Sequence, residues 1–342
     1  MDFIQKNKEF DLIGLGEVML RLSPPNAEKI SQGESFDKNA GGSELNVASG
    51  AALLGLRSAI ITKIPENKIG HFIRNKIRYG NVSDDYIVYD TASTARLGIY
   101  YYETGAYPRK SSVIYDRAAS SMTTLRIEEI NPDIYQKAGI FHVSSISLAL
   151  DAQLCNTVIQ MIKHFRENGT AISFDVNYRA ALWDEDTARK MVESVLPYVD
   201  ILFVSEETSR RMLRRTGTLE DIMQGYCKDY GCKIVATTMR QVVSPKIHNF
   251  TSKLCYEGKF YEEKPYEGIE VVDRVGSGDA YLAGVLFGLT RYADPQRAVE
   301  LGNAMSAIKN TISGDMPACS PSEIDGIIRA HHATGHQDEM NR

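Results

Sequence analysis

The chain has 342 residues, 43% of them hydrophobic and 24% charged, which is an ordinary composition for a globular protein. Its formal net charge is −5 and it has no basic run, which argues against nucleic acid or an anionic membrane surface as a partner. The N-terminus lacks an apolar signal core, and no segment reaches the apolar length of a membrane span. We therefore expect a cytoplasmic protein, folded as a single domain over residues 1–342.

Cysteine usage agrees with a reducing compartment. The five cysteines form no C-x-x-C pair, and Cys227 and Cys232 have no second pair or nearby histidines that would complete a zinc site. We expect five reduced thiols.

The N-terminal region predicts a buried strand over residues 11–18, followed by short strands near 20–22 and 29–31 around a proline turn. Gly14 and Gly16 suggest a dinucleotide fingerprint, but the position of the third glycine is Met19, so we reject that interpretation.

A pair of glycines, Gly41 and Gly42, precedes a small-residue helix predicted over residues 45–54. Small residues permit close packing against a sheet, which is the structural interpretation. The functional interpretation is a polar ligand held against the glycine backbone with Asn46 one turn into the helix, because an amide can both donate to and accept from a sugar hydroxyl.

Residues 94–121 depart from the surrounding pattern. The segments 96–103 and 112–117 are rich in β-forming residues, are joined by a turn, and have no helix of their own. Together with residues 19–36 they predict a small β lid inserted in the domain. Alternation along the second strand places Tyr115 and Arg117 on one face, where they are candidate ligand contacts.

Regular alternation of strands and helices accounts for most of the remaining chain. Helices are expected over 66–80, 151–168, 185–196 and 321–332, and strands over 58–64, 140–144, 171–176, 201–204 and 233–238, with antiparallel structure over 251–272. This order indicates a mostly parallel sheet with helices on both faces, which binds ligands at the carboxyl ends of its strands. Polar residues stand at those ends: Asp175, Asn177, Arg179, Ser205, Glu206, Thr237 and Thr238.

The most informative stretch runs from Asp273 to Ala280, between an extended segment and an apolar helix. Backbone N–H groups of Gly276, Ser277 and Gly278, together with the helix N-terminus, suit an anion. Asp279 has two interpretations: a helix cap, or a general base that takes a proton from a hydroxyl attacking a bound phosphate.

Taken together, Gly41-Gly42-x-x-x-Asn46-x-Ala48 and Asp273-x-x-Gly276-x-Gly278-Asp279-Ala280 resemble the ribokinase (PfkB) family of carbohydrate kinases over roughly residues 10–330. Residues 174–183 and 204–207 resemble the 2-keto-3-deoxygluconate kinases of that family most closely. The resemblance implies a three-layer α/β/α sandwich with a β-sheet lid, and transfer of the γ-phosphoryl group of ATP, with Mg²⁺, to a primary hydroxyl of a sugar acid.

The resemblance also implies residue roles. Asp279 is the base, and Gly276, Ser277 and Gly278 form the anion hole. The sugar-acid contacts are Gly42, Asn46, Tyr100, Tyr115, Arg117 and Arg179, with Arg117 for the carboxylate; Asn177, Arg179, Thr238 and Asn303 face the nucleotide, and Glu206 contacts the metal through water. A homodimer through the lid is a further expectation.

This sequence departs from the family pattern at several positions. Ser205-x-x-Thr208 replaces the usual Asn-x-x-Glu, residues 237–245 lack the expected Gly-x-x-Gly loop, and Asp116 replaces a common aromatic residue. Two alternatives therefore stay open: a kinase of fructose or another neutral sugar, and a non-catalytic sugar- or nucleotide-binding regulator on the same fold.

Overall fold

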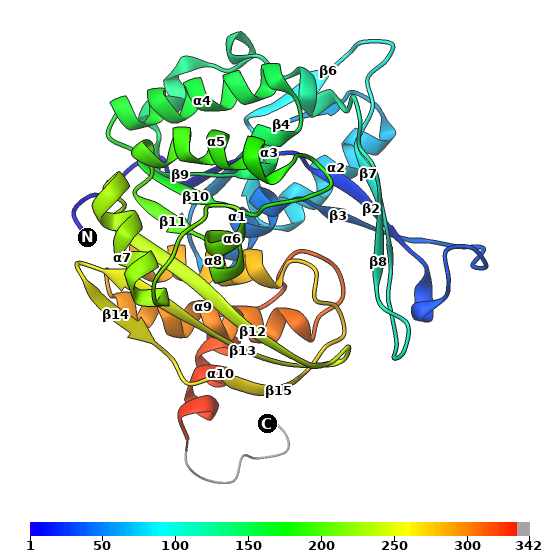
Figure 1. Cartoon of the computed structure of the whole chain (residues 1–342). Coiled ribbons are helices and arrows are strands. Elements are labelled where there is room, and N and C mark those ends of the chain that lie inside the picture. Colours follow the sequence, from blue (N-terminus) through cyan, green and yellow to red (C-terminus); the bar gives the residue numbers. More distant parts are fainter. Residues whose placement is uncertain (334–342) are drawn as a thin grey trace.

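The computed structural model describes residues 1–333, and its central element is a large, mostly parallel β-sheet (Figure 1). The strands follow the order β14-β13-β12-β11-β10-β9-β1-β4-β5, with β15 paired to β13 and β6 to β4. Pairs from β12 to β5 are parallel, whereas β13 is antiparallel to β12, β14 and β15. The bounds are β1 Phe10–Leu15, β4 Ser58–Pro65, β5 Val82–Ser83, β6 Ile87–Asp90, β9 Ala138–Ser144, β10 Ala171–Asp175, β11 Ile201–Phe203, β12 Ile234–Ser244, β13 Ile247–Tyr256, β14 Lys259–Glu262 and β15 Tyr266–Glu270.

Helices cover both faces of this sheet and give the expected three layers. The core on one face receives apolar side chains from α4, α5 and α7, and the core on the other from α1, α8, α9 and α10 (Figure 1). The bounds are α1 Ser43–Leu54, α2 Lys68–Tyr79, α3 Ser145–Ala149, α4 Ala152–Glu167, α5 Glu185–Val195, α6 Glu206–Arg211, α7 Leu219–Tyr230, α8 Ser277–Arg291, α9 Pro295–Asn310 and α10 Pro321–His332.

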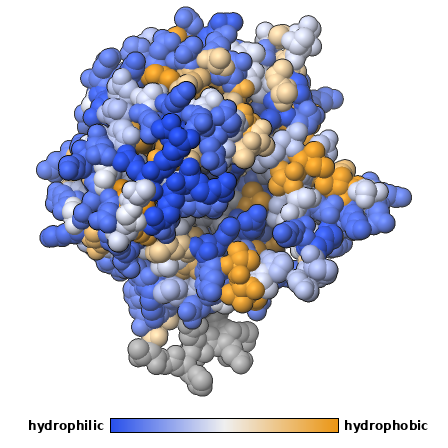
Figure 2. All heavy atoms as spheres, viewed as in Figure 1, coloured by the Kyte–Doolittle hydropathy of each residue, from blue (hydrophilic) through white to orange (hydrophobic). Residues whose placement is uncertain are grey.

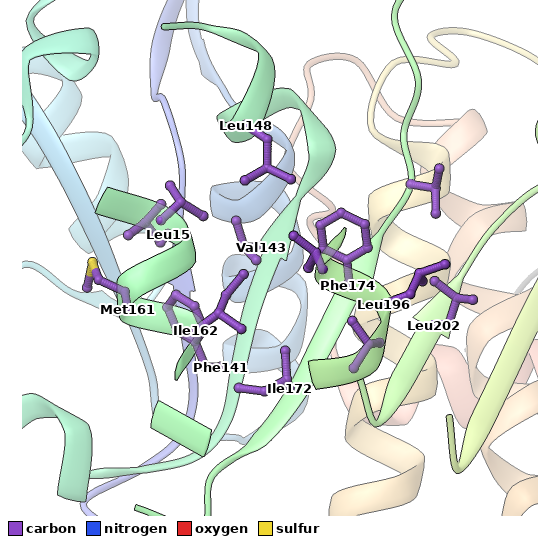
Figure 3. Close-up of a cluster of buried hydrophobic side chains, with 14 of the residues drawn as sticks. Leu15, Phe141, Val143, Leu148, Met161, Ile162, Ile172, Phe174, Leu196 and Leu202 are labelled. Atoms are coloured by element: carbon purple, nitrogen blue, oxygen red, sulfur yellow. The ribbon is translucent and has the colours of Figure 1, made fainter. Parts of the chain in front are cut away.

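Strands with both faces buried need nearly continuous apolar sequences, and β9 and β10 have them. Phe141 and Val143 of β9 lie beside Ile172 and Phe174 of β10 in the core under α4 (Figure 3). Phe141 stacks on Phe165 of α4 with 4.2 Å between ring centroids. This packing fixes the carboxyl ends of the strands, where the candidate site lies.

The lid is a separate four-stranded sheet in the order β3-β2-β7-β8, which projects from the domain (Figure 1). Its strands are β2 Met19–Ser23, β3 Asp37–Gly41, β7 Ile99–Glu103 and β8 Ser112–Asp116. The prediction of a strand near residues 29–31 is wrong, because these residues lie in a turn and the strand comes later, at β3. The first lid segment therefore continues to Gly41, directly before α1.

The antiparallel region begins earlier than the predicted residues 251–272, because β12 and β13 form a long hairpin. Pairing of β12 with β13 begins where Ile234 faces Tyr256 and continues outward to Val242 opposite His248, with a register irregularity between Val242 and Ser244. The segment that replaces the expected Gly-x-x-Gly loop thus belongs to this hairpin. Within residues 1–333 no helix is long and apolar enough to cross a bilayer. The single-domain prediction extends to residue 342, and its last nine positions lie outside the described residues.

Candidate active site

A cavity of about 580 Å³ lies where the lid meets the carboxyl ends of the central strands and the start of α8. The predicted site residues that line it are Gly42, Asn46, Tyr100, Tyr115, Arg117, Asn177, Arg179, Gly276, Ser277, Gly278 and Asp279. These residues come from both glycine-rich motifs, the lid and the strand that precedes Asn177. The structure therefore brings segments from distant parts of the sequence to one place.

The glycine loop before α8 needs its first glycine for two reasons. Gly276 has φ of +83°, in the left-handed region that favours glycine, and a Cβ here would lie 2.0 Å from the backbone oxygen of Asp315. Helix α8 begins at Ser277 without a side-chain cap, so no side chain binds its first N–H groups, although the Ser277 N–H donates to the backbone oxygen of Arg274 at 3.2 Å. This is the geometry of an anion site.

Asp279 is not a helix cap. Its Oδ1 accepts a hydrogen bond from Ser43 Oγ at 2.9 Å, and its Oδ2 accepts one from Asn46 Nδ2 at 2.7 Å. Both donors belong to the first turn of α1, and Asn177 Nδ2 in turn donates to Ser43 Oγ at 3.1 Å. The capping interpretation is therefore wrong, and the carboxylate is held at the cavity by residues of the Gly41–Asn46 motif.

The surroundings of Asp279 raise its own pKa and that of the neighbouring Asp175. Burial raises the pKa of Asp279, and the hydrogen bonds from Asn46 and Ser43 oppose this shift. Burial, together with the negative charges of Asp279 and Glu44, raises the pKa of Asp175 to about 7. Asp175, Asp279 and Glu44 line the same cavity, so three carboxyl groups lie in one poorly solvated region.

A network of buried charged side chains holds the loop that precedes α8. Arg21 of β2 forms ion pairs with Asp273 at 2.6 Å and Asp315 at 2.7 Å, and all three side chains are nearly inaccessible. Asp315 also accepts a hydrogen bond from Tyr100. The fully buried Lys309 donates to the backbone oxygens of Asp273 at 3.1 Å and Ile312 at 3.0 Å. Two cations and two carboxylates thus tie the lid, the loop and the end of α9 together.

Arg117, the expected carboxylate-binding residue, already has an acidic partner. Its guanidinium binds the carboxylate of Glu17, with 2.8 Å between Nε and Oε2, and Ser120 also donates to Glu17. Both side chains line the cavity although little of either is exposed. Arg117 therefore faces the site as half of an ion pair. Tyr115 lies beside it with its ring exposed.

Three predicted site residues do not line this cavity. Asn303 is fully buried within α9, where its Oδ1 accepts from Ser252 Oγ at 2.7 Å, so the structure gives it no surface for a nucleotide. Glu206 lies at the first position of α6 and forms an ion pair with Arg210 at 2.7 Å. Thr238 lies in β12, and it is Arg240, two positions further along the strand, that reaches the cavity.

The altered Asn-x-x-Glu motif has a local explanation. Ser205 is the N-cap of α6, where its Oγ accepts from the Thr208 N–H at 3.1 Å and donates to Thr208 Oγ1 at 2.8 Å. These two side chains satisfy each other, which is a capping role.

Sequence reasoning missed several residues of the cavity wall: Glu17, Glu44, Arg240, Arg274 and Asp315. Arg274 stood inside the glycine motif, so its place in that loop was a usable signal. Glu44 likewise stood inside the Gly41–Asn46 motif. The remaining three reach the site through pairing across sheets and loops, which no short motif encodes.

A sandwich with a β lid, a glycine loop opening α8, and a carboxylate at its third position define a carbohydrate-kinase site. The family model described as pfkB family carbohydrate kinase matches residues 10–322. The chain belongs to the PfkB family of carbohydrate kinases, and it is a phosphotransferase that acts on sugars.

Relatives within the family are similar over nearly the whole chain. The 2-dehydro-3-deoxygalactonokinase of Haloferax volcanii is 33% identical over 94% of this chain and 98% of its own length. The 2-dehydro-3-deoxygluconokinase of Bacillus subtilis is 28% identical over 96% and 98%. A crystal structure of 2-dehydro-3-deoxygluconokinase from Thermotoga maritima is 34% identical, with a TM-score of 0.89 and coverage of 93% of this chain and 98% of that one.

Proposed function

We propose that this kinase transfers the γ-phosphoryl group of ATP to a primary hydroxyl of 2-keto-3-deoxygluconate. The observation that carries the proposal is the placement of Asp279 beside the glycine loop, in a cavity whose wall also holds several arginines. The named activities of the two relatives and of the similar crystal structure support a 2-keto-3-deoxy sugar acid as the substrate class.

In this proposal Asp279 is the general base. The substrate hydroxyl gives its proton to the Asp279 carboxylate while the hydroxyl oxygen forms a bond to the γ-phosphorus, and the bond to the β-phosphate oxygen breaks to release ADP. Ser43 and Asn46 fix the carboxylate so that the oxygen–proton geometry is set before the substrate arrives. The raised pKa of Asp279, which results from burial, makes it a better proton acceptor than an exposed aspartate.

Charge developing on the transferred group needs stabilisation more than covalent help. The N–H groups of Gly276, Ser277 and Gly278 supply it at the start of α8, and Arg179 supplies a cation from the same cavity. Asn177 binds Ser43 and orients the group that holds Asp279.

Mg²⁺ fits the acidic side of the cavity. Asp175 and Asp279 offer carboxylate oxygens, the ligand type that Mg²⁺ prefers, and both line the cavity with Glu44. When bound, the ion neutralises charge on the nucleotide phosphates. Glu206, the metal contact predicted from the sequence, pairs with Arg210 and does not line the cavity, so it is not proposed as a ligand.

A second candidate substrate is fructose or another neutral sugar. The observation that favours it is the Glu17–Arg117 ion pair, because Glu17 already neutralises the guanidinium expected to bind a substrate carboxylate. A coupled assay of ADP release across 2-keto-3-deoxygluconate, 2-keto-3-deoxygalactonate, fructose and ribose tests both. Turnover of fructose with none of either acid would overturn the acid proposal.

The same proposal includes a homodimer through the lid and a cytoplasmic location. Strand β8 is the edge of the lid sheet, and its Val113 and Ile114 are exposed, giving the apolar surface over this strand in Figure 2. A second copy would cover both the strand edge and this surface. Light scattering tests the mass, and Ile114→Lys should shift a dimer toward monomer. Five free cysteines suit a reducing compartment.

A further inference from the structure

Three arginines of the cavity wall, Arg179, Arg240 and Arg274, form no ion pair within residues 1–333, and two of them lie toward the outer hairpin. Arg240 lies in the outer half of the β12–β13 hairpin, and Arg274 lies in the loop that leads into α8. Both line the cavity that contains Asp279. Across residues 1–333 neither forms an ion pair with an aspartate or glutamate, although Asp273 is adjacent to Arg274 in sequence, because Arg21 takes that carboxylate.

The two guanidinium groups act on each other. Partial burial of Arg240, and then the positive charge of Arg274, lower the pKa of Arg240, although part of its side chain remains exposed. Burial, followed by the charges of both arginines, lowers the pKa of His248, which is nearly inaccessible in β13. The Nδ1 atom of His248 also has no hydrogen-bond partner. Like charges held together without a counterion are unfavourable, so the local structure favours an incoming anion.

The other cations of this region have acidic neighbours. The positive charge of Arg179, which forms no ion pair, acts on Asp175 and Asp279 and opposes the rise in their pKa values. Arg117 binds Glu17, and Arg21 binds Asp273 and Asp315. The surplus positive charge near the outer hairpin therefore belongs to Arg240 and Arg274, which expose their side chains.

We propose that Arg240 and Arg274 form an anion-binding subsite that holds a phosphate or carboxylate group of a reactant. The identity of that reactant rests on the proposed function, but the affinity for an oxyanion does not. A guanidinium fork matches the oxygens of either group and can bind them in a bidentate manner. The subsite uses the long hairpin that stands where the Gly-x-x-Gly loop was expected.

The first experiment needs no turnover. The full chain is titrated calorimetrically with inorganic pyrophosphate, as wild type, R240Q and R274Q, with R214Q as a matched control. Arg214 is exposed, pairs with Asp186 and does not line the cavity. Each charge-assisted hydrogen bond lost should weaken binding about tenfold or more, and R214Q should bind like wild type. Melting temperatures confirm that the variants are folded.

The second experiment separates the two sources of the anion. The same proteins are titrated with ADP and with 2-keto-3-deoxygluconate. Weaker ADP binding in R240Q and R274Q assigns the subsite to nucleotide phosphate, and weaker binding of the acid assigns it to the carboxylate. Wild-type affinity of both variants for all three probes would overturn the subsite, as would a wild-type protein that binds none of them. Weaker pyrophosphate binding in a protein without kinase activity would leave the subsite intact and overturn the proposed function.

Discussion

Replacement of Lys309 by methionine tests how far the glycine loop depends on a single buried cation. The ammonium group of Lys309 is the donor to two backbone oxygens, Asp273 O in the loop and Ile312 O after α9. Burial lowers the pKa of Lys309, and the charges of Asp273 and Asp315 oppose this shift. Methionine retains the length of the side chain but leaves both oxygens without this donor and the two carboxylates with Arg21 alone.

The expected cost follows from the two hydrogen bonds. Each hydrogen bond from a charged donor contributes roughly 1.5–3 kcal/mol, and two are lost, so the free energy of unfolding, measured by urea denaturation, should fall by roughly 3–6 kcal/mol. A displacement of the loop by about 1 Å would also lower kcat by on the order of 10²-fold.

Lys137→Met is the matched control. Lys137 forms an ion pair with Glu9 at 3.0 Å, and its side chain is 35% exposed. A surface pair of this kind contributes about 0–1 kcal/mol, so this variant should unfold almost as wild type does. If Lys309→Met also unfolds within about 1 kcal/mol of wild type and retains its kcat, the supporting role of the buried cation is refuted.

Three further substitutions, one of them with a matched control, test the site. Asp279→Asn should lower kcat by about 10²-fold or more with little change in melting temperature, and full activity would remove the base assignment. Gly276→Ala should cost at least about 2 kcal/mol, because its φ is +83° and its Cβ would meet Asp315 O at 2.0 Å; Gly278→Ala, with no atom within 4 Å of its Cβ, is the control and should be nearly neutral. Asp175 has a folded-state pKa raised to about 7, so its protonated form favours the folded state and that advantage is lost as pH rises. The stability of wild type relative to Asp175→Asn should fall between about pH 4 and pH 7 and then level off, and a flat difference would contradict the shift.

The sequence predicted those parts of the molecule whose signals are local. Alternating strands and helices, and the two glycine motifs, were enough to predict the layers, the lid and the position of Asp279, because each depends on residues close together in the chain. The Ser43 and Asn46 donors belong to the Gly41–Asn46 motif, which reaches Asp279 once the helices are placed. The strand near residues 29–31 was wrong because a proline turn and a short apolar segment do not determine where a new strand begins.

Long-range pairings explain the remaining differences. Arg21 and Asp315 are 294 positions apart, and Glu17 and Arg117 are 100 apart, so neither pair produces a pattern within a motif. Asn303 is polar, and its burial against Ser252 depends on how α9 packs on β13. Such partners become visible only after the chain has folded.

The anchoring of Arg21 has a consequence for how the enzyme would close over a substrate. This residue belongs to the lid, yet its guanidinium is fixed by Asp273 and Asp315 at the root of the catalytic loop. A hinge that swung the whole lid would have to break two buried ion pairs on each turnover. Tyr100 of β7 binds the same Asp315, and Arg117, directly after β8, pairs with Glu17, so the lid is clamped along its base and closure would occur by flexing of the outer ends of its strands.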